Sequence, residues 1–145
     1  MIGRAARLSR RAFAGRVALA CVAWSALAFA GSYLNSAALL LAQALVEAEY
    51  LRARINDREL AELVHRLADA RLDAAKGMLV PKEVALAHPH LLLVLENYER
   101  AADAATRGGM SQFLVYQQRA RDEDRTFRGV LKQLGYSLPE TKPSN

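Results

Sequence analysis

Apolar side chains recur every three or four residues along most of the chain, which is the spacing of an α-helix. Between Ser36 and Lys76 there is neither proline nor glycine, and good helix formers dominate. Two apolar stripes follow this segment: Leu41, Leu45, Ala48 and Ile55, and then Leu60, Leu63, Leu67, Ala70 and Ala74. They fall out of register at Asn56-Asp57, which predicts either a twist in one long helix or a break capped by one of these residues.

Two more helices are predicted in the second half of the chain. Pro89 suits a helix start, and the apolar face that follows ends before Gly108-Gly109. The last helix, for which Ser111 is the expected cap, repeats an apolar residue every seven positions: Phe113, Ala120, Phe127 and Leu134. Gly135 then stands where a helix-ending glycine is expected.

These patterns predict an all-α fold, because no sustained alternation of apolar and polar residues indicates a strand. We expect residues 31–138 to form an antiparallel bundle of three helices, or of four if the chain breaks at Asn56-Asp57. Residues 1–30 are expected to be a signal or anchor helix, and residues 139–145 a flexible tail.

The first helix is predicted to be much longer than its partners. At roughly forty residues it would measure about 60 Å, more than twice their reach. Its N-terminal half would then carry an uncovered apolar face. We therefore expect this face to meet a membrane, a second copy of the chain or a partner helix through Leu39, Leu40, Leu41, Leu45 and Ile55. The alternative is that the helix breaks and folds back on the others.

The stretch Val17–Ala30 is apolar over fourteen residues, the length of a signal-peptide core and short for a membrane span of about twenty. Ala28-Phe29-Ala30 offers the small-x-small pattern of a signal peptidase site, with Gly31 as the first residue after cleavage. Apolar character resumes after Gly31, so residues 17–40 are the alternative, a retained membrane anchor. Both interpretations place the body outside the cytoplasmic membrane.

The residues before this stretch, Ser9-Arg10-Arg11-Ala12-Phe13, resemble the twin-arginine export signal of bacteria, S-R-R-x-F-L-K. Arg10, Arg11 and Phe13 carry the likeness, whereas Ala14 and Gly15 stand in place of Leu and Lys. The resemblance covers the leader only. It implies a cargo that folds before export, often because it carries a cofactor or assembles with a partner. An ordinary secretory leader with adjacent arginines is the alternative.

Charge argues against nucleic acid as a partner. The net charge of +5 arises from five arginines within residues 1–30, and from Gly31 onward basic and acidic residues balance. The body therefore lacks the excess of positive charge that nucleic-acid binding requires. Cys21 is the only cysteine, which excludes a disulfide framework and a cysteine zinc site in the body.

Two histidine patterns are weak metal candidates. Glu62 and His65 have the E-x-x-H spacing of di-iron bundles, which need two such pairs, and only one is present. His88 and His90 flank Pro89 and are placed to approach each other, as a copper or zinc site would need. A solvated helix face and a proline turn explain both patterns equally simply.

No nucleophile motif or phosphate-binding loop is present, so no catalytic residue and no cofactor are expected. We interpret the chain as a non-enzymatic, exported helical bundle on the periplasmic side of a bacterial cell envelope. It would act through protein–protein contacts, with a partner or with itself. A small metal- or ligand-binding bundle and a membrane-tethered accessory or sensor subunit are the alternatives.

Overall fold

The computed structural model describes the backbone of residues 11–141 and the side chains of residues 28–141. It contains four α-helices: α1 (Arg11–Ala53), α2 (Arg58–Lys76), α3 (His88–Thr106) and α4 (Met110–Gln133). A short 3₁₀ turn, η1 (Lys82–Val84), lies between α2 and α3. The described residues hold no strand, so the all-α prediction is confirmed, with four helices rather than three.

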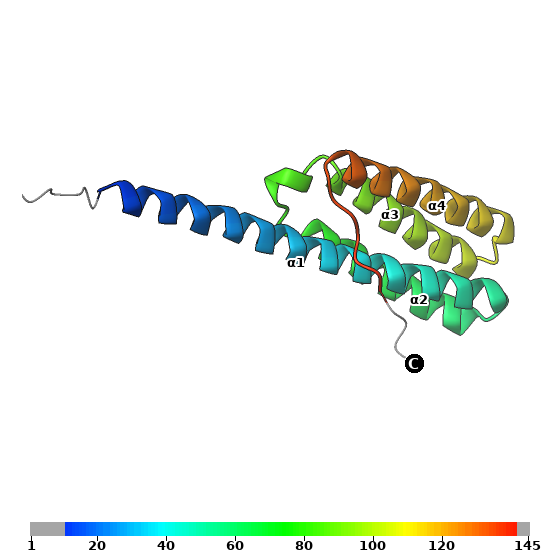
Figure 1. Ribbon diagram of the computed structural model, residues 1–145. Coiled ribbons are helices and arrows are strands. Elements are labelled where there is room, and N and C mark those ends of the chain that lie inside the picture. Colours follow the sequence, from blue (N-terminus) through cyan, green and yellow to red (C-terminus); the bar gives the residue numbers. More distant parts are fainter. Residues whose placement is uncertain (1–10, 142–145) are drawn as a thin grey trace, which may run out of the picture.

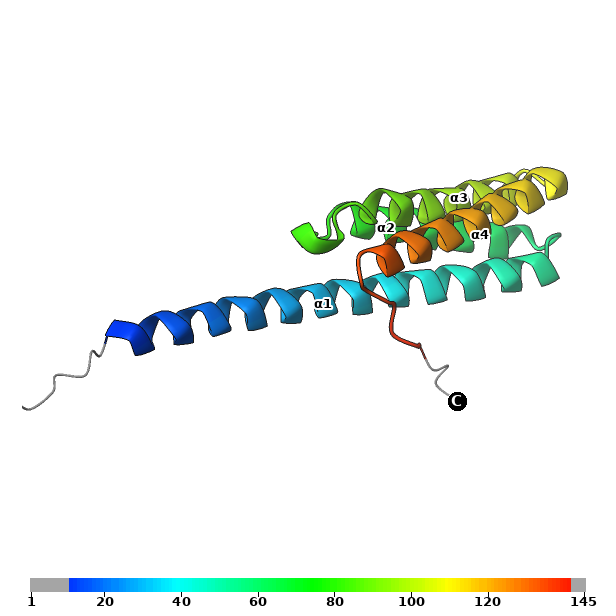
Figure 2. The ribbon, with the colours of Figure 1, turned by 45° about the horizontal axis from the view of Figure 1, so that its top comes forward.

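Successive helices run antiparallel and form one bundle, as Figures 1 and 2 show. The C-terminal part of α1 lies against α2 and α3, and α3 packs extensively against both α2 and α4. The N-terminal part of α1 projects beyond the bundle in both views. The bundle end from which it projects also holds η1, the start of α3 and the end of α4.

The helix boundaries follow from local chemistry. The chain breaks after α1 because the Asp57 carboxylate accepts a hydrogen bond from the backbone N–H of Leu60 at 3.0 Å, which caps α2. Gly135 ends α4 with a φ of +84°, and the N–H of Tyr136 donates to the carbonyl of Leu131 at 2.9 Å. Gly77 follows α2 as its C-cap.

The cap predicted for α4 is wrong. The helix begins at Met110 after Gly109, and no side chain caps it, so Ser111 lies within the first turn. Gly108, with a φ of +72°, ends α3 in the same left-handed conformation as Gly135. Two glycines therefore make this turn with backbone alone, which leaves no role for a serine cap.

The core consists of two apolar clusters, and each contains side chains from all four helices. Three members of the predicted seven-residue repeat on α4, Phe113, Ala120 and Phe127, are fully inaccessible, whereas Leu134 follows the helix and is partly buried. On α3 the buried residues include Leu91, Leu95 and Tyr98. On α1 one stripe of buried side chains recurs in alternating steps of four and three residues, which repeat every seven: Ala30, Leu34, Ala37, Leu41, Ala44, Ala48 and Leu51. A seven-residue repeat is typical of helices whose axes lie nearly parallel or antiparallel in a bundle.

The leucine stripe predicted as the buried face of α2 is wrong. Leu63 and Leu67 are 47% and 43% exposed, whereas Ala61, Val64 and Ala68 face the core. Alanine and valine lie where α2 approaches α3, because small side chains allow the two backbones to come close. The leucines flank this contact on the outer surface.

The connection from α2 to α3 closes one end of the bundle. Val84 and Ala87 are fully buried in the same apolar cluster as Tyr33 and Leu34 of α1. The chain after α4 also contributes, because Tyr136 and Leu138 pack against this cluster. Residues 139–141 are exposed and have no regular structure, and the rest of the predicted tail, residues 142–145, lies outside the described residues.

Candidate functional site

A groove of about 1340 Å³ lies between α1 and α4. Its α1 wall is apolar and carries Leu39, Leu45 and Val46, which are 54%, 44% and 53% exposed. Val94 and Tyr98 of α3 form its floor, and Leu138–Thr141 lie along one side. The exposed apolar wall has no covering element among the described residues.

The α4 wall of the groove is charged. Arg121, Arg125 and Arg128 recur at helical spacing, so they form a row on one face of α4. Their side chains are 45%, 75% and 53% exposed. Each guanidinium has one acidic partner, Glu49, Asp122 and Asp124 respectively, and a guanidinium carries five N–H donors. The row therefore keeps donors directed toward solvent.

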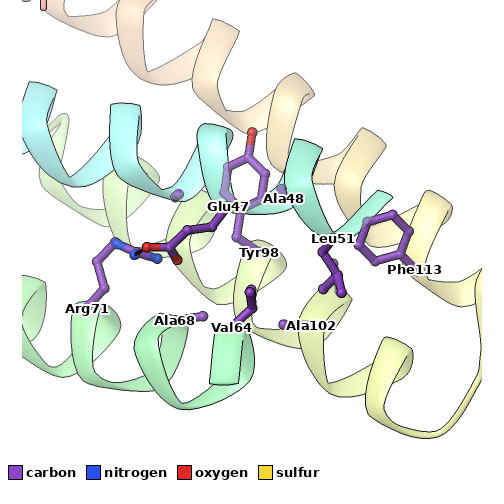
Figure 3. Close-up of a pocket in the computed structure, with 11 residues that line it drawn as sticks. Glu47, Ala48, Leu51, Val64, Ala68, Arg71, Tyr98, Ala102 and Phe113 are labelled. Atoms are coloured by element: carbon purple, nitrogen blue, oxygen red, sulfur yellow. Dashed lines mark hydrogen bonds and ion pairs between the residues drawn. The ribbon is translucent and has the colours of Figure 1, made fainter. Parts of the chain in front are cut away.

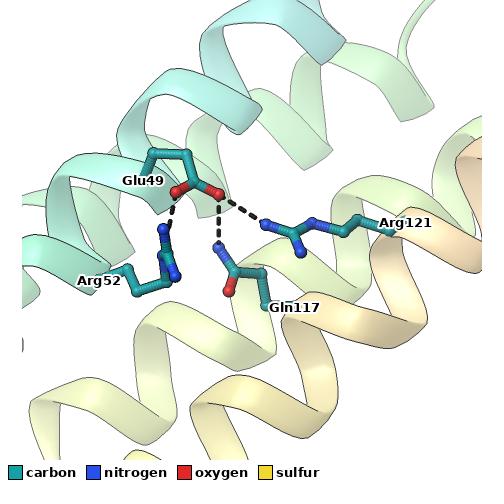
Figure 4. A network of polar contacts seen from close by, with 4 residues as sticks. All are labelled: Glu49, Arg52, Gln117 and Arg121. Carbon is teal, nitrogen blue, oxygen red and sulfur yellow. Dashed lines mark hydrogen bonds and ion pairs between the residues drawn. The ribbon is translucent and has the colours of Figure 1, made fainter.

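Glu49 of α1 contacts two side chains of α4, one of them the groove residue Arg121, as Figure 4 shows. Its Oε1 accepts hydrogen bonds from Arg121 at 2.6 Å and from the buried Gln117 at 3.3 Å, and its Oε2 accepts one from Arg52 at 3.0 Å. One carboxylate on α1 thus holds two side chains of α4. This contact fixes the position of α4 along the axis of α1.

Tyr98 lies under the groove and is 7% exposed. Burial raises the pKa of its phenol, and the nearby carboxylate of Asp124 raises it further. The hydroxyl therefore stays protonated at neutral pH. It is a neutral hydrogen-bonding group beneath the groove and does not act as a base.

A second hollow, of about 10 Å³, lies inside the bundle beside a buried ion pair (Figure 3). Arg71 of α2 donates to Glu47 of α1 at 2.6 Å, and the Arg71 side chain is 6% exposed. Glu47 Oε2 and Arg71 Nε have no hydrogen-bond partner in the described chain. Such a volume is on the order of one water molecule and too small for an organic ligand. This hollow is a packing feature that links α1 to α2.

The Glu62–His65 metal hypothesis receives no support from the geometry. Glu62 pairs with Arg58 at 3.2 Å on the exposed face of α2. His65 instead contacts Glu99 of α3, with 2.8 Å between Nε2 and Oε1. The described residues contain no group of three or more potential metal ligands. His65 therefore serves as a link between α2 and α3.

His88 and His90 do not converge either, because they begin α3 and face different helices. His88 Nδ1 lies 3.1 Å from the Tyr33 hydroxyl of α1, with the two rings edge to face. His90 Nδ1 lies 3.2 Å from Glu123 Oε2 of α4. Each of the three histidines in the chain thus joins two helices.

The Tyr33–His88 contact has a defined protonation state. Burial raises the pKa of Tyr33 to about 12 and lowers the pKa of His88. At neutral pH both groups are uncharged, so the Tyr33 hydroxyl can donate to an unprotonated Nδ1. This contact ties α1 to the first turn of α3.

The residues of the predicted interaction face do not lie together on one exposed surface. Leu41 is 5% exposed and belongs to the core, so the expectation that it is uncovered is wrong. Ile55 is partly buried in the α1–α2 turn, where it packs against the cluster that contains Leu51. Leu41 and Leu45 both line the groove, but of the two only Leu45 is exposed. The reason is that the C-terminal half of α1 folds against the bundle and buries one side of the helix.

The residues of the predicted leader fall partly within the structure. Arg10 lies outside the described residues, and the side chains of Arg11 and Phe13 do as well. At the predicted cleavage site Ala28 is exposed, whereas Ala30 is 1% exposed and Gly31 continues the helix. The proposed anchor of residues 17–40 is thereby shortened, because Tyr33, Leu34 and Ala37 are core residues.

Among the described side chains, Ala28–Ala53 is a helical stretch long and apolar enough to cross a membrane. In that stretch 39% of the most apolar window is buried inside the bundle. Length and composition alone fit this stretch equally to a signal sequence, a membrane anchor or a core helix of a soluble protein.

The groove residues on α4 were missed by sequence reasoning. Arg121, Arg125 and Arg128 occur in a run of mixed charge that is typical of a solvated helix face. Their spacing places them on one face, but the apolar wall opposite belongs to α1 and is distant in the sequence.

Comparison of the chain with family models, curated proteins and solved structures gave no match.

Proposed function

We propose that this protein is a non-enzymatic helical bundle of a bacterial cell envelope. The first part of α1 tethers it to the membrane. The groove between α1 and α4 binds a helix of a partner protein. The observation that carries the proposal is the continuity of α1. It runs without interruption from the apolar segment into the core, where Ala30, Tyr33 and Leu34 are buried.

This continuity favours a retained tether over a cleaved leader. A protease cleaves chain that it can bind in an extended form, and helical, buried backbone resists it. Ala30 lies within α1 and is 1% exposed. Once the bundle has formed, the predicted cleavage site is therefore protected.

The chemistry of the groove favours an amphipathic helix as its occupant. Leu39, Leu45 and Val46 offer an apolar wall parallel to a helix axis, which suits the apolar face of a helix laid into the groove. The row of Arg121, Arg125 and Arg128 along the other wall is complementary to acidic residues on that helix. We therefore expect a partner helix with one apolar and one acidic face.

The tether is tested by the intact mass of the protein recovered from its native host, with soluble and membrane fractions kept separate. We expect the uncleaved mass, in the membrane fraction. A soluble product that begins at Gly31 would contradict the tether.

The groove is tested with a photo-crosslinking residue at position 45 and, as a control, at position 114. Leu45 and Leu114 are 44% and 46% exposed, but Leu114 lies outside the groove. We expect adducts at position 45 alone, and mass spectrometry should map them to an amphipathic, acidic helix of another protein. Adducts to a second copy of this chain, or equal adducts at both positions, would contradict the proposed occupant.

A further inference from the structure

Two leucines in the connection between α2 and α3 point away from the bundle. Leu79 and Leu86 are 78% and 74% exposed, the highest fractions among the large apolar side chains of the described residues. Their neighbours Val84 and Ala87 are fully buried. The connection is therefore packed against the core, and it holds the two leucines outward.

The connection that carries these leucines lies at the bundle end from which α1 projects, as both ribbon views show. The Tyr33–His88 contact places Tyr33 level with the first residue of α3, directly after this connection. Phe29, four residues earlier on α1, is 44% exposed. Exposed apolar side chains thus surround the point where α1 leaves the bundle.

Lysine gathers at the same end. The described residues contain three lysines: Lys76 in the last turn of α2, Lys82 in η1 and Lys132 in the last turn of α4. Arginine supplies the positive charges elsewhere in the described chain. Lysine has a long apolar stem and a terminal ammonium, which suits the boundary between lipid chains and anionic headgroups.

The projecting part of α1 approaches the length that a bilayer requires. Residues 11–29 form about 28 Å of helix, of which the apolar run from Val17 makes up about 20 Å, against a hydrocarbon thickness of about 30 Å. Arginine side chains near a helix end can extend to the headgroups, which accommodates this difference. If this segment spans the bilayer, the bundle begins directly at the membrane surface. No linker separates the segment from the bundle, because α1 is a single helix.

We infer that this end of the bundle is a lipid-binding surface, in which Leu79 and Leu86 enter the bilayer and Lys76, Lys82 and Lys132 contact anionic headgroups. The inference rests on the proposed tether and deepens it. This end of the bundle would then contact the membrane surface directly. The groove would face the aqueous space beside the bilayer.

The test uses the full chain with Cys21→Ser, reconstituted into vesicles of phosphatidylcholine and phosphatidylglycerol. Leu79→Cys, Leu86→Cys and, as a control, Leu114→Cys each carry an environment-sensitive fluorophore. Leu114 is exposed on α4 near the opposite end of the bundle. We expect lipid-borne quenchers to reduce the fluorescence at positions 79 and 86 several-fold more than at position 114. The difference should weaken in vesicles of phosphatidylcholine alone.

An alkaline wash of the same vesicles separates the two proposals. Equal quenching at all three positions, with the protein retained, would overturn the lipid-binding surface and leave the tether intact. Selective quenching at positions 79 and 86, with the protein released by the wash, would support the surface and contradict the tether. Loss of both signals would overturn both. Circular dichroism of each variant checks that the helices are unchanged.

Discussion

At the scale of single residues, Arg71 and Glu47 show how a charged pair fits into a core built mainly from alanine. The pair lies between α1 and α2, and two of its polar atoms lack partners in the described chain. Removing charges from water is costly, so such a pair adds little net stability. Removing Glu47 is far more harmful, because the Arg71 charge then stays buried without its partner.

We therefore predict opposite results for single and paired substitutions. Glu47→Ala should lower the free energy of unfolding by about 3–5 kcal/mol, because Arg71, whose side chain is 6% exposed, loses its partner. Arg71→Met combined with Glu47→Leu should leave stability unchanged or raise it. Urea unfolding of the detergent-solubilised chain measures both. Similar losses in the single and the double variant would refute this account of the pair.

The second prediction concerns His88 and the dependence of the protein's stability on pH. Burial lowers the pKa of His88 in the folded protein relative to the unfolded value of about 6.5. The unfolded chain therefore takes up the proton first as the pH falls. The stability that His88 contributes is complete above about pH 7 and is lost as the pH falls through about 6.5.

His88→Asn removes this titration while keeping a polar atom near the position of Nδ1. We expect the stability advantage of the wild-type protein over His88→Asn to shrink as the pH is lowered from about 7.5 to about 5. Thermal unfolding across this range measures the difference. Parallel pH curves for the two proteins would rule out His88 as the source.

At the scale of elements, the sequence predicts α4 well and α2 poorly. The aromatic residues at positions 113 and 127 mark the buried face of α4 unambiguously, since burying a large ring is strongly favourable. On α2 the apolar residues occupy more than one face, and the leucines are more conspicuous than the alanines. Which face is buried depends on how closely α3 approaches, and a single helix does not reveal that distance.

Two glycines at the end of α4 give a matched pair for a third prediction. Gly135 has a φ of +84°, a conformation that costs other residues about 1 kcal/mol or more. Gly129 lies inside α4, and nothing lies within 4 Å of where a Cβ would be placed. Gly135→Ala should therefore destabilise the protein by about 1 kcal/mol. Gly129→Ala should stabilise it by about 0.5–1 kcal/mol.

Equilibrium unfolding of both variants tests this pair directly. The substitutions are chemically identical, so a shared effect of alanine on the unfolded chain largely cancels between them. Changes of the same sign in both variants would contradict the assignment of the two glycines to different roles.

At the scale of the whole molecule, long-range pairs decide what sequence reasoning finds. All three histidines were recognised as noteworthy, but each has its partner at least 33 residues away: Glu99, Tyr33 and Glu123. Local spacing suggested metal binding, whereas the fold uses these residues to join helices. The groove was missed for the same reason, because its two walls come from opposite ends of the chain.

α1 is the helix most readily separated from the others, since the contact of α3 with α4 and with α2 is more extensive. Ala37 is fully buried where α1 enters the core, and a larger side chain there would cost about 1–3 kcal/mol. We predict that Ala37→Leu speeds hydrogen exchange in residues 30–48 while α3 and α4 keep their protection. Ser36→Leu, on the exposed side of α1, is the control. Uniform loss of protection across all helices would show that α1 does not open separately.

The single helix that joins the projecting segment to the core also fixes an angle. Each residue turns an α-helix by about 100°, so the side of α1 that faces the core at Ala37 determines which side of the projecting segment points in any given direction. One residue inserted near Gly31 would rotate the bundle by about 100° about this axis, and seven residues would nearly restore its heading. The direction in which the groove opens is therefore encoded in the number of residues between the apolar segment and Tyr33.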